Sequence, residues 1–427
     1  MCSSQRVTRR TADHSRHPRY SLVLVMALLL FPMLTTCGKK RPPPLPPRTQ
    51  PSARKTDKRP SEKRPSDRRV QTPEAAASAP RIRLLLKESF SALTVRGSSL
   101  APVVLVKAEG DKIALRKGEG ELSRVLGTGS GFRLDPADAA HPLVVDGSAY
   151  RGSIEVFLNP LSIPVAVNDV DLEEYLRGTV PNELHPSRFP QIEALKAQTV
   201  AARTFAFYHL GLNVKRGFDV YADERSQVYS GVKVEQPLTD QAIAETSGIL
   251  ATYDDRAILA VYSSTCGGKT ESYAGMFQKD LPYLKGGVEC SDEISPFHSW
   301  QTKCPGAKIE TALNRTSRFG RLRKIEPVKR GVSGRVIEMK LIGSEGNALL
   351  KGNQIRFTLG IRSNLIVDLE TEKDRNGNIT EVSVKGKGWG HGVGLCQFGA
   401  VELARKGQDY ERILKHYYQD IDLKRNH

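Results

Sequence analysis

One glutamate, Glu183, has the setting of a residue that can do acid–base chemistry. It lies on a proline-rich turn between two predicted helices, with the apolar residues Val180 and Leu184 beside it. A carboxyl group in apolar surroundings keeps its proton to a higher pH than usual and can then donate that proton to a leaving group. The other interpretation is structural. Glu183 could cap the following helix, because carboxylates near helix starts often accept hydrogen bonds from free backbone N–H groups, or it could pair with Arg188 or Arg203.

A glycine-rich stretch near the end of the chain supplies further candidates. Trp389 and His391 stand among the glycines of Gly388–Gly394, which allow the backbone to approach another group closely. The indole can stack on a sugar ring or belong to the core. The imidazole can bind sugar, orient Glu183, or simply pack with its hydrogen bonds satisfied.

Polar side chains suited to neutral sugars complete the predicted site. Ser226, Gln227 and Tyr229 carry hydroxyl and amide groups, although a polar turn explains them equally well. The hydroxyl run Ser263–Thr265 has no neighbouring base in the sequence, so we do not expect a covalent nucleophile there. The full set of predicted substrate-binding residues is Arg203, Ser226, Gln227, Tyr229, Ser264, Trp389, His391 and Gln397.

The helix before Glu183 has clear start and stop signals. Asp171 can cap a helix over Leu172–Arg177, and Glu174 can reach back to complete a capping box. Gly178 can end that helix.

The helix after Glu183 is predicted from Pro190, which suits a first turn, to about Leu210. Its apolar circumference indicates burial with other backbone close by. Three polar residues on it, Lys196, Gln198 and Arg203, then need partners inside the protein. The small residues that permit the close approach are Ala194, Ala197, Ala201, Ala202 and Ala206.

The elements around this helix pair predict an α+β fold, in which an antiparallel, strand-rich domain packs with the alanine-rich helical segment and a cleft lies between them. Short apolar runs separated by turn residues fill 81–163, as in an antiparallel sheet. The main domain then covers 164–427, and 309–381 has the character of a possible insertion or subdomain. Within the main domain we expect a helix over Thr239–Gly248 and strands at Ile249–Tyr253 and Ala257–Tyr262.

The first residues have the pattern of an exported lipoprotein. Residues 1–19 hold five arginines and one acid, and the apolar run Tyr20–Leu34 is too short for a comfortable membrane span. The run leads to Cys37 in a sequence similar to a lipobox, with Thr36 departing from the usual small residue. We therefore expect a lipoprotein signal peptide over 1–36, a lipidated Cys37, and an extracytoplasmic protein anchored to a membrane.

The formal charge of +17 does not indicate nucleic-acid binding. Residues 39–70 carry twelve Lys or Arg and three acids, a net +9, and residues 1–37 add +4, which leaves only +4 for the rest. Residues 39–70 contain eight prolines and few apolar residues, and 37–80 is predicted to be a disordered tether. It can adhere to anionic lipid or wall polymer, or act only as a spacer.

Several blocks of this sequence resemble the SpoIID/LytB family of bacterial cell-wall proteins. The blocks run in family order from Val167 to Tyr418, and they read VNDVDLEEYLRGTVPNEL, EALKAQTVAARTFAF, SQVY, YSSTCGGKTES, PYLKGGV, GWGHGVGLCQFGA and ILKHYY. The agreement of these separated blocks in order and spacing makes a chance match very improbable.

The resemblance implies two functions. One branch consists of lytic transglycosylases that cleave peptidoglycan glycan strands, preferentially strands stripped of stem peptides, and the catalytic acid of that branch corresponds to Glu183. The other branch is described as modifying or stimulating a wall amidase without cleaving glycan itself. Peptidoglycan is the expected partner in both, and neither requires a redox or nucleotide cofactor.

The cysteines after Cys37 leave two possibilities open. Cys266, Cys290, Cys304 and Cys396 are even in number in an oxidising compartment, so one or two disulfides are expected. The resemblance adds a structural zinc site, because some family members hold zinc near the Cys-Gly-Gly block. The ligands would then be Cys266, Cys290, His298 and Cys396. Cys266 and Cys290 are the pair most expected together, as a bond or as ligands.

Overall fold

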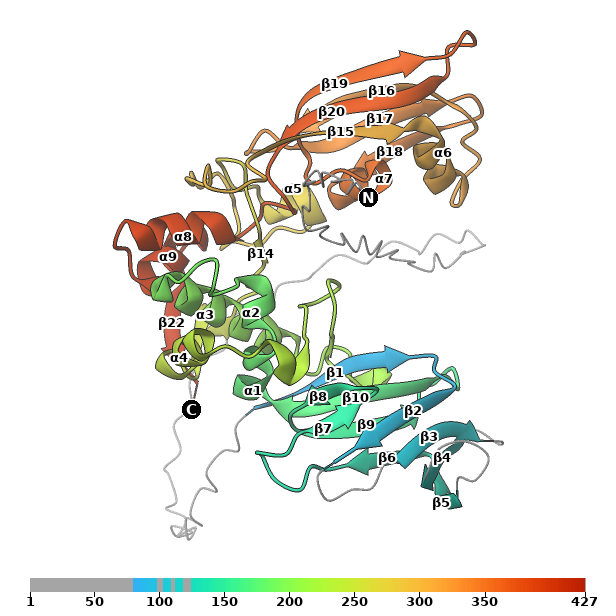
Figure 1. The fold of residues 1–427 in the computed structure, drawn as a ribbon. Coiled ribbons are helices and arrows are strands. Elements are labelled where there is room, and N and C mark those ends of the chain that lie inside the picture. The colour runs from blue at the N-terminus through green and yellow to red at the C-terminus, as the bar shows by residue number, and fades with distance from the viewer. Residues whose placement is uncertain (1–79, 98–102, 109–111, 118–123, 427) are drawn as a thin grey trace, which may run out of the picture. The chain divides into compact units, whose positions relative to one another are not determined.

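The computed structural model describes residues 80–97, 103–108, 112–117 and 124–426. The predicted signal peptide, the lipidation site Cys37 and nearly all of the predicted tether lie outside the described residues. Within the described part, no helix is both long and apolar enough to cross a membrane. The fold is α+β, as predicted, with antiparallel sheets and an alanine-rich helical segment (Figure 1).

Two sheets form from residues 81–171 and one short strand added later in the chain. The strands are β1 (Arg81–Glu88), β2 (Ala92–Arg96), β3 (Val103–Ala108), β4 (Lys112–Lys117), β5 (Arg124–Gly129), β6 (Gly131–Leu134), β7 (Leu143–Val145), β8 (Ser148–Tyr150), β9 (Ser153–Leu158), β10 (Pro164–Asp171) and β11 (Val220–Tyr221). Their orders are β11-β1-β10-β9-β6 and β5-β4-β3-β2-β7-β8. Side chains from both sheets, among them Leu93, Leu105 and Val156, share one hydrophobic cluster.

The first helix begins where β10 ends. Helix α1 (Leu172–Arg177) is capped by Asp171, whose side chain accepts hydrogen bonds from the backbone N–H groups of Glu173 and Glu174, and it ends at Gly178, as predicted. The predicted capping box is wrong in one respect. Glu174 turns outward to Arg151 and Arg177, since these cations attract its carboxylate more than a neutral N–H group does.

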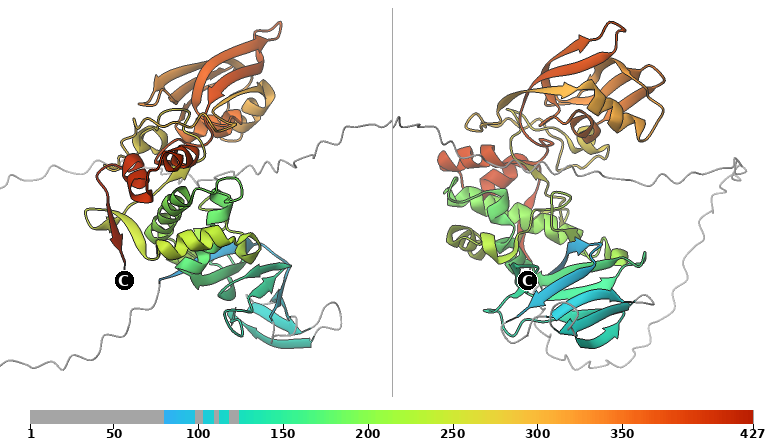
Figure 2. Two further views of the ribbon diagram at one scale, coloured as in Figure 1. Left: turned by 60° about the vertical axis from the view of Figure 1, so that its left-hand side comes forward. Right: turned by 45° about the vertical axis from the view of Figure 1, so that its right-hand side comes forward.

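The alanine-rich helix α3 (Ile192–His209) is the centre of the helical region. Its N-cap is Gln191, so Pro190 lies just outside the helix rather than in its first turn. Between α1 and α3 the chain forms one unpredicted short helix, α2 (Val180–Glu183). The alanines of α3 allow close packing against α4 (Pro237–Glu245), β12 (Ile249–Tyr253), α8 (Gln397–Arg405) and α9 (Tyr410–Tyr417). Figure 2 shows the two C-terminal helices, in red, beside the green helices of this region.

The strand predicted over Ala257–Tyr262 is wrong. The chain instead forms two short strands, β13 (Arg256–Ala257) beside β12, and β14 (Tyr262–Ser263), which pairs in parallel with β21 (Leu395–Cys396). The predicted strand is interrupted because β13 and β14 pair with different strands. The pairing of β14 with β21 brings the hydroxyl run and the C-terminal glycine motif together. A last strand, β22 (Asp422–Arg425), adds to β12.

Residues 299–387 hold a hydrophobic cluster of their own, which includes Trp300, Phe319 and Ile355. The elements there form two three-stranded sheets, β15-β20-β19 and β16-β17-β18. They are β15 (Ser299–Pro305), α6 (Gly306–Asn314), β16 (Leu322–Arg330), β17 (Val336–Gly343), β18 (Asn347–Lys351), α7 (Asn353–Leu359), β19 (Leu365–Lys373) and β20 (Ile379–Lys387). The stretch 309–381, predicted as a possible insertion, lies inside this unit. One more helix, α5 (Tyr273–Phe277), precedes it.

Candidate functional site

A pocket of about 300 Å³ brings together most of the predicted site residues. Seven of them line it: Glu183, Ser226, Gln227, Ser264, Trp389, His391 and Gln397. These residues come from the end of α2, the loop after β11, the segment after β14, the glycine motif and the start of α8. Only the tertiary structure joins these five segments.

Glu183 is held at the pocket by the residue before it. Asn182 donates hydrogen bonds from its side-chain amide to the backbone oxygens of Gly178 (3.0 Å) and Val228 (3.1 Å), and to the hydroxyl of Ser230 (3.1 Å). The α2 turn is therefore fastened to the 228–230 segment. A side chain at position 178 is excluded, because its Cβ would lie 2.5 Å from the ring of Tyr229.

The half-buried carboxyl group of Glu183 has few but well-placed partners. The backbone N–H of Val228 lies 3.4 Å from Oε1, and Nε2 of Gln397 lies 3.4 Å from Oε2. Burial raises the pKa of Glu183 to about 7, and the negative charge of Glu224 adds to this, while hydrogen bonds from Val228, Gln397 and Tyr262 limit the rise. A pKa near 7 allows the carboxyl group both to give and to accept a proton close to neutral pH.

A chain of hydrogen bonds leads to Glu183 from the interior. The hydroxyl of Tyr175 donates to Oε1 of Gln227 (2.9 Å), and Nε2 of Gln227 donates to the hydroxyl of Tyr262 (2.8 Å). Burial and the nearby charge of Glu183 raise the pKa of Tyr262 far above its usual value. Tyr262 therefore stays protonated and can donate to Glu183.

The glycine motif, which is the stretch Gly388–Gly394, forms another part of the pocket lining. Thr265 and Trp389 exchange backbone hydrogen bonds of 3.1 and 2.9 Å, which tie this motif to the segment after β14. Burial lowers the pKa of His391 to about 3, so its imidazole is neutral, and its Nδ1 accepts a hydrogen bond from the N–H of Val393 (3.0 Å). A neutral imidazole can hydrogen-bond to sugar but does not supply a cationic acid.

The fully buried Arg335, which belongs to the 299–387 unit, contacts both the glycine-rich stretch Gly388–Gly394 and the segment 266–269. Its guanidinium donates to the carbonyls of Cys266 (2.6 Å) and Lys269 (3.2 Å). Gly392 has φ +70°, and a Cβ there would lie 2.2 Å from the guanidinium carbon. At Gly392 the close approach that the sequence predicted is therefore made by Arg335, whereas Gly390 and Gly394 are approached by Ser263 and by the carbonyl of Val261.

Two predicted binding residues, Arg203 and Tyr229, do not line this pocket. Arg203 is 1% exposed and forms two hydrogen bonds of 2.7 Å to the carboxylate of Glu173. The hydroxyl of the buried Tyr229 donates to Oδ1 of Asn168 (3.0 Å). Both side chains therefore stabilise the fold and do not reach the pocket.

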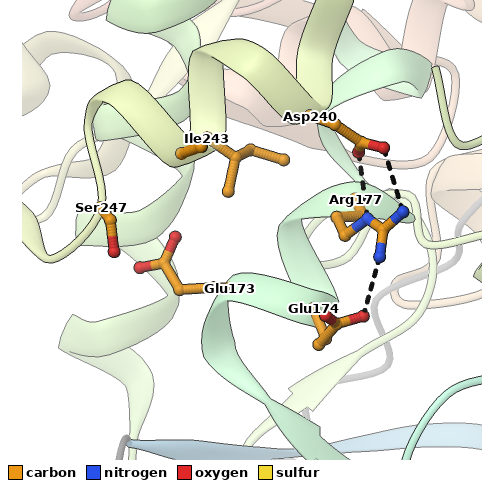
Figure 3. A pocket seen from close by; sticks show the side chains of 7 residues that line it. Glu173, Glu174, Arg177, Asp240, Ile243 and Ser247 are labelled. Carbon is orange, nitrogen blue, oxygen red and sulfur yellow. Dashed lines mark hydrogen bonds and ion pairs between the residues drawn. The ribbon is translucent and has the colours of Figure 1, made fainter. Parts of the chain in front are cut away.

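Glu173 belongs to the lining of a second pocket, of about 230 Å³ (Figure 3). The charged side chains of this second pocket form ion pairs with one another. Arg177 pairs with both Asp240 (3.0 Å) and Glu174 (3.2 Å). A ligand there would have to break these pairs.

The sequence did not point to several residues that line the larger pocket. Tyr262 directly precedes the hydroxyl run Ser263–Thr265, and this position in the sequence could have identified it as a pocket residue. Glu224 is an exposed acid in a polar loop and gave none. Arg356 lies on α7, in a region without a recognised motif.

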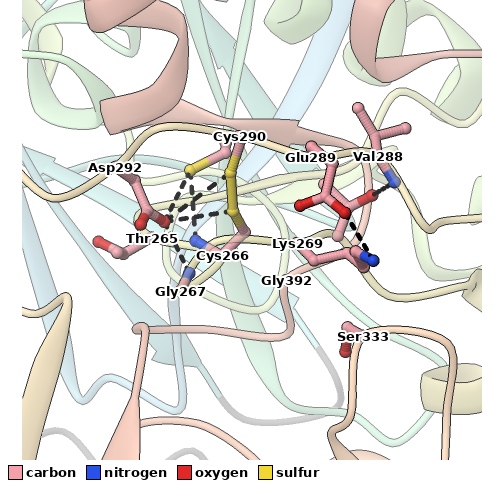
Figure 4. Close-up of a disulfide and its surroundings, with 12 residues drawn as sticks. Thr265, Cys266, Gly267, Lys269, Val288, Glu289, Cys290, Asp292, Ser333 and Gly392 are labelled. Atoms are coloured by element: carbon pink, nitrogen blue, oxygen red, sulfur yellow. Dashed lines mark hydrogen bonds and ion pairs between the residues drawn. A yellow bond between two sulfur atoms is a disulfide. The ribbon is translucent and has the colours of Figure 1, made fainter.

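Three of the cysteines, Cys266, Cys290 and Cys396, form a buried cluster with Asp292. Cys266 and Cys290 form a disulfide (Figure 4). Cys304 and Cys396 are free and buried. Oδ2 of Asp292 lies 3.2 Å from Sγ of Cys266, 3.9 Å from Sγ of Cys290 and 3.6 Å from Sγ of Cys396. One carboxylate oxygen is thus surrounded by three sulfur atoms.

The side chains of this cluster could hold a metal ion if the disulfide were reduced. The potential ligand atoms of Cys266, Cys290, Asp292 and Cys396 all lie within 4.8 Å of one another, and all four residues are buried. The predicted set differs by one residue, because His298 contacts Asp292 instead (Nδ1 to Oδ1, 2.7 Å). A histidine that holds a ligating carboxylate is a usual second layer of a zinc site.

Comparisons with known proteins find two matching family models and several relatives. A family model described as "Stage II sporulation protein" matches residues 164–253, which include Glu183, and a "Domain of unknown function" model matches 280–394. An uncharacterised protein of Brachyspira hyodysenteriae is 33% identical over 288 residues, covering 65% of this chain and 73% of that protein.

Two named relatives come from Bacillus subtilis. Stage II sporulation protein D is 32% identical over 301 residues, covering 64% of this chain and 82% of that protein. The amidase enhancer is 26% identical over 359 residues, covering 73% of this chain but only 49% of that protein. With relatives above 30% identity matched over most of their length, the chain belongs to the SpoIID/LytB family.

Proposed function

We propose that this protein is a lytic transglycosylase that cleaves the glycan strands of cell-wall peptidoglycan, with Glu183 as the general acid and base. The observation that carries the proposal is the position of Glu183. Its carboxyl group, with a pKa of about 7, lies in a pocket lined by Trp389, Ser226 and Ser264, which are side chains suited to sugar.

In the proposed reaction Glu183 begins protonated. It donates its proton to the glycosidic oxygen as the bond between that oxygen and C1 of the muramic acid breaks. The 6-hydroxyl of the same sugar then bonds to C1, and the Glu183 carboxylate accepts the hydroxyl proton. The products are a 1,6-anhydro end and a free 4-hydroxyl, and the carboxyl group returns to its starting state.

A single carboxyl group suffices for this reaction, whereas most glycosidases use two. Glu224 is a second carboxylate in the lining of the pocket, and it is exposed. Hydrolysis assisted by Glu224 would leave a reducing sugar instead of an anhydro sugar. The end group of the product therefore distinguishes the two mechanisms.

The proposed site of action is outside the cytoplasm, with the protein tethered to a membrane through lipidated Cys37. The family membership supports a cell-wall role, and the lipobox-like sequence before Cys37 supports the anchor. Peptidoglycan is the proposed macromolecular partner.

The proposed chemistry needs no cofactor. With Cys266 and Cys290 reduced, we propose that these residues, Asp292 and Cys396 hold a structural zinc ion. Its role would be to fix the Cys-Gly-Gly loop against the start of α8, beside Gln397.

The alternative function is that of a non-catalytic protein that binds peptidoglycan and activates a partner amidase. The observation that favours it is the match to a protein named amidase enhancer over 73% of this chain. In that case Glu183 would contact glycan without transferring a proton.

The deciding experiment compares the protein with its Glu183→Gln variant on purified glycan strands, with and without stem peptides. We expect anhydro-ended products from the parent and a loss of about 10²-fold or more in the variant, whose folding is checked by circular dichroism. Gln241→Met, an exposed change on α4, is the matched control. Products from the Glu183→Gln variant at the parent rate would contradict the role of Glu183.

A different result would favour the enhancer. If neither protein releases products, but the parent binds glycan and accelerates an added cell-wall amidase, the protein is an enhancer and the transglycosylase proposal is wrong.

A further inference from the structure

One cationic side chain in the pocket lining has no counter-charge. Arg356 lies on α7 of the 299–387 unit and lines the same pocket as Glu183. Among the described residues its guanidinium forms no ion pair, and its Nε is buried without a hydrogen-bond partner. Its guanidinium carbon lies 4.5 Å from the centre of the Phe357 ring, which is a contact with its own neighbour in the chain.

The other arginines around the site are engaged by the protein. Arg203 is paired with Glu173, and Arg335 donates to the carbonyls of Cys266 and Lys269. Arg362 lies over the ring of Trp389, 5.1 Å from its centre. Arg356 thus differs from Arg203 and Arg335, whose guanidinium groups donate to acceptors in the protein, and it differs from Arg362 in lining the pocket.

An unpaired guanidinium in a buried setting lowers the stability of the folded protein. Burial lowers the pKa of Arg356 from its usual value, but a guanidinium remains charged at neutral pH. A ligand that supplies an anion would remove this cost, and the planar guanidinium suits a carboxylate in particular.

We infer that Arg356 binds the free lactyl carboxylate of a muramic acid in the pocket, which makes it the residue that selects glycan from which the stem peptide has been removed. This inference rests on the proposed glycan substrate. The hydroxyl and acetamido groups of the strand are neutral. The lactyl group is the one acidic substituent of the sugar ring, and an amide bond neutralises it when a stem peptide is attached.

The acids of the pocket are consistent with this role. Glu183 is neutral when it acts as the acid, so it does not repel the bound carboxylate at that stage. Glu224 is exposed, where water screens its charge. Arg356 is the group that a ligand carboxylate would find without a partner.

The inference gives a function to the region matched only as a domain of unknown function. Helix α7 would carry the selectivity residue, while Glu183, from the 164–253 match, would carry the chemistry. Loss of selectivity and loss of cleavage should therefore be separable by mutation.

The experiment uses the full chain and three forms of the same glycan strands: peptide-free with the free lactyl carboxylate, peptide-free with that carboxylate converted to a methylamide, and peptide-bearing. Product formation and equilibrium binding are measured on each. The variants are Arg356→Gln and Arg356→Lys, and the matched control is Arg375→Gln, an exposed arginine in the same unit.

The parent should prefer the free carboxylate to the methylamide by tenfold or more in kcat/KM and in binding. Arg356→Gln should remove most of this preference by losing affinity for the free carboxylate alone, Arg356→Lys should keep part of it, and Arg375→Gln should keep all of it. Equal losses on all three strands, or an unchanged preference in Arg356→Gln, would overturn the inference.

Two further outcomes are informative. A preference for peptide-bearing strands that disappears in Arg356→Gln would assign the arginine to a stem-peptide carboxylate and refute the lactyl assignment. If the parent cleaves nothing but binds free-carboxylate strands with a preference that depends on Arg356, the inference holds and the transglycosylase proposal fails.

Discussion

Nε2 of Gln397 lies 3.4 Å from Oε2 of Glu183, although 214 positions separate the two residues in the chain. The same nitrogen lies 3.4 Å from Oε1 of Gln198 on α3. Gln397 is the first residue of α8, so the packing of α8 on α3 sets this contact. The proton affinity of Glu183 therefore depends on how two distant helices meet.

The first prediction concerns the pH dependence of glycan cleavage. If Glu183 is the acid of the free enzyme, kcat/KM should fall as the pH rises through about 7, because the carboxyl group must be protonated to donate. Initial rates between pH 5 and 9, on strands whose own ionisation is constant in that range, measure this. A falling limb near pH 4.5 instead would mean that Glu183 has an ordinary pKa.

The second prediction concerns stability. The folded pKa of Glu183 is raised above its ordinary value, so the folded state keeps this proton after the unfolded state has lost it. The contribution to the free energy of unfolding is fully present below pH 4.5 and is lost as the pH rises to about 7. The loss is on the order of 3 kcal/mol.

Glu183→Gln lacks this titration, so its stability relative to the parent should increase between pH 4.5 and 7 and then level off. Urea denaturation of both proteins across this range measures the difference. A difference that does not change with pH would contradict the raised pKa.

The third prediction concerns Gln397. Its hydrogen bond lowers the pKa of Glu183, so Gln397→Met should move the falling limb of the pH profile to higher pH. A purely structural role for Gln397 would lower the rate without moving the limb. Gln241→Met, on the exposed face of α4, should leave both the rate and the limb unchanged.

The fourth prediction concerns the cysteine cluster. Protein purified under reducing conditions with zinc should contain about one zinc ion per chain by elemental analysis. Asp292→Ala should lower the zinc content, because it removes one of the four clustered groups. Cys304→Ser should not, since Cys304 lies outside the cluster.

Oxidised protein should instead carry the Cys266–Cys290 disulfide and no zinc, as shown by thiol titration and peptide mapping. Zinc bound equally in oxidised and reduced protein would contradict the assignment of these two sulfurs as ligands.

The sequence by itself determined several local elements and pointed to Glu183 as the candidate acid. Asp171 and Gly178 set the ends of α1, the alanines of α3 predicted its burial, and the apolar runs predicted β1, β9 and β12. These features depend on residues a few positions apart, through capping and through helix or strand periodicity. The family blocks then pointed to Glu183.

Only the tertiary structure decided which groups surround that acid. Gln397, Tyr262 and Arg356 reach the pocket of Glu183 from separate segments, and Asp292 takes the place in the cysteine cluster that the sequence suggested for His298. Arg203 was predicted at the site but pairs with Glu173 in the interior. Contacts across such separations depend on strand pairing and helix packing, and no periodic pattern along the chain records them.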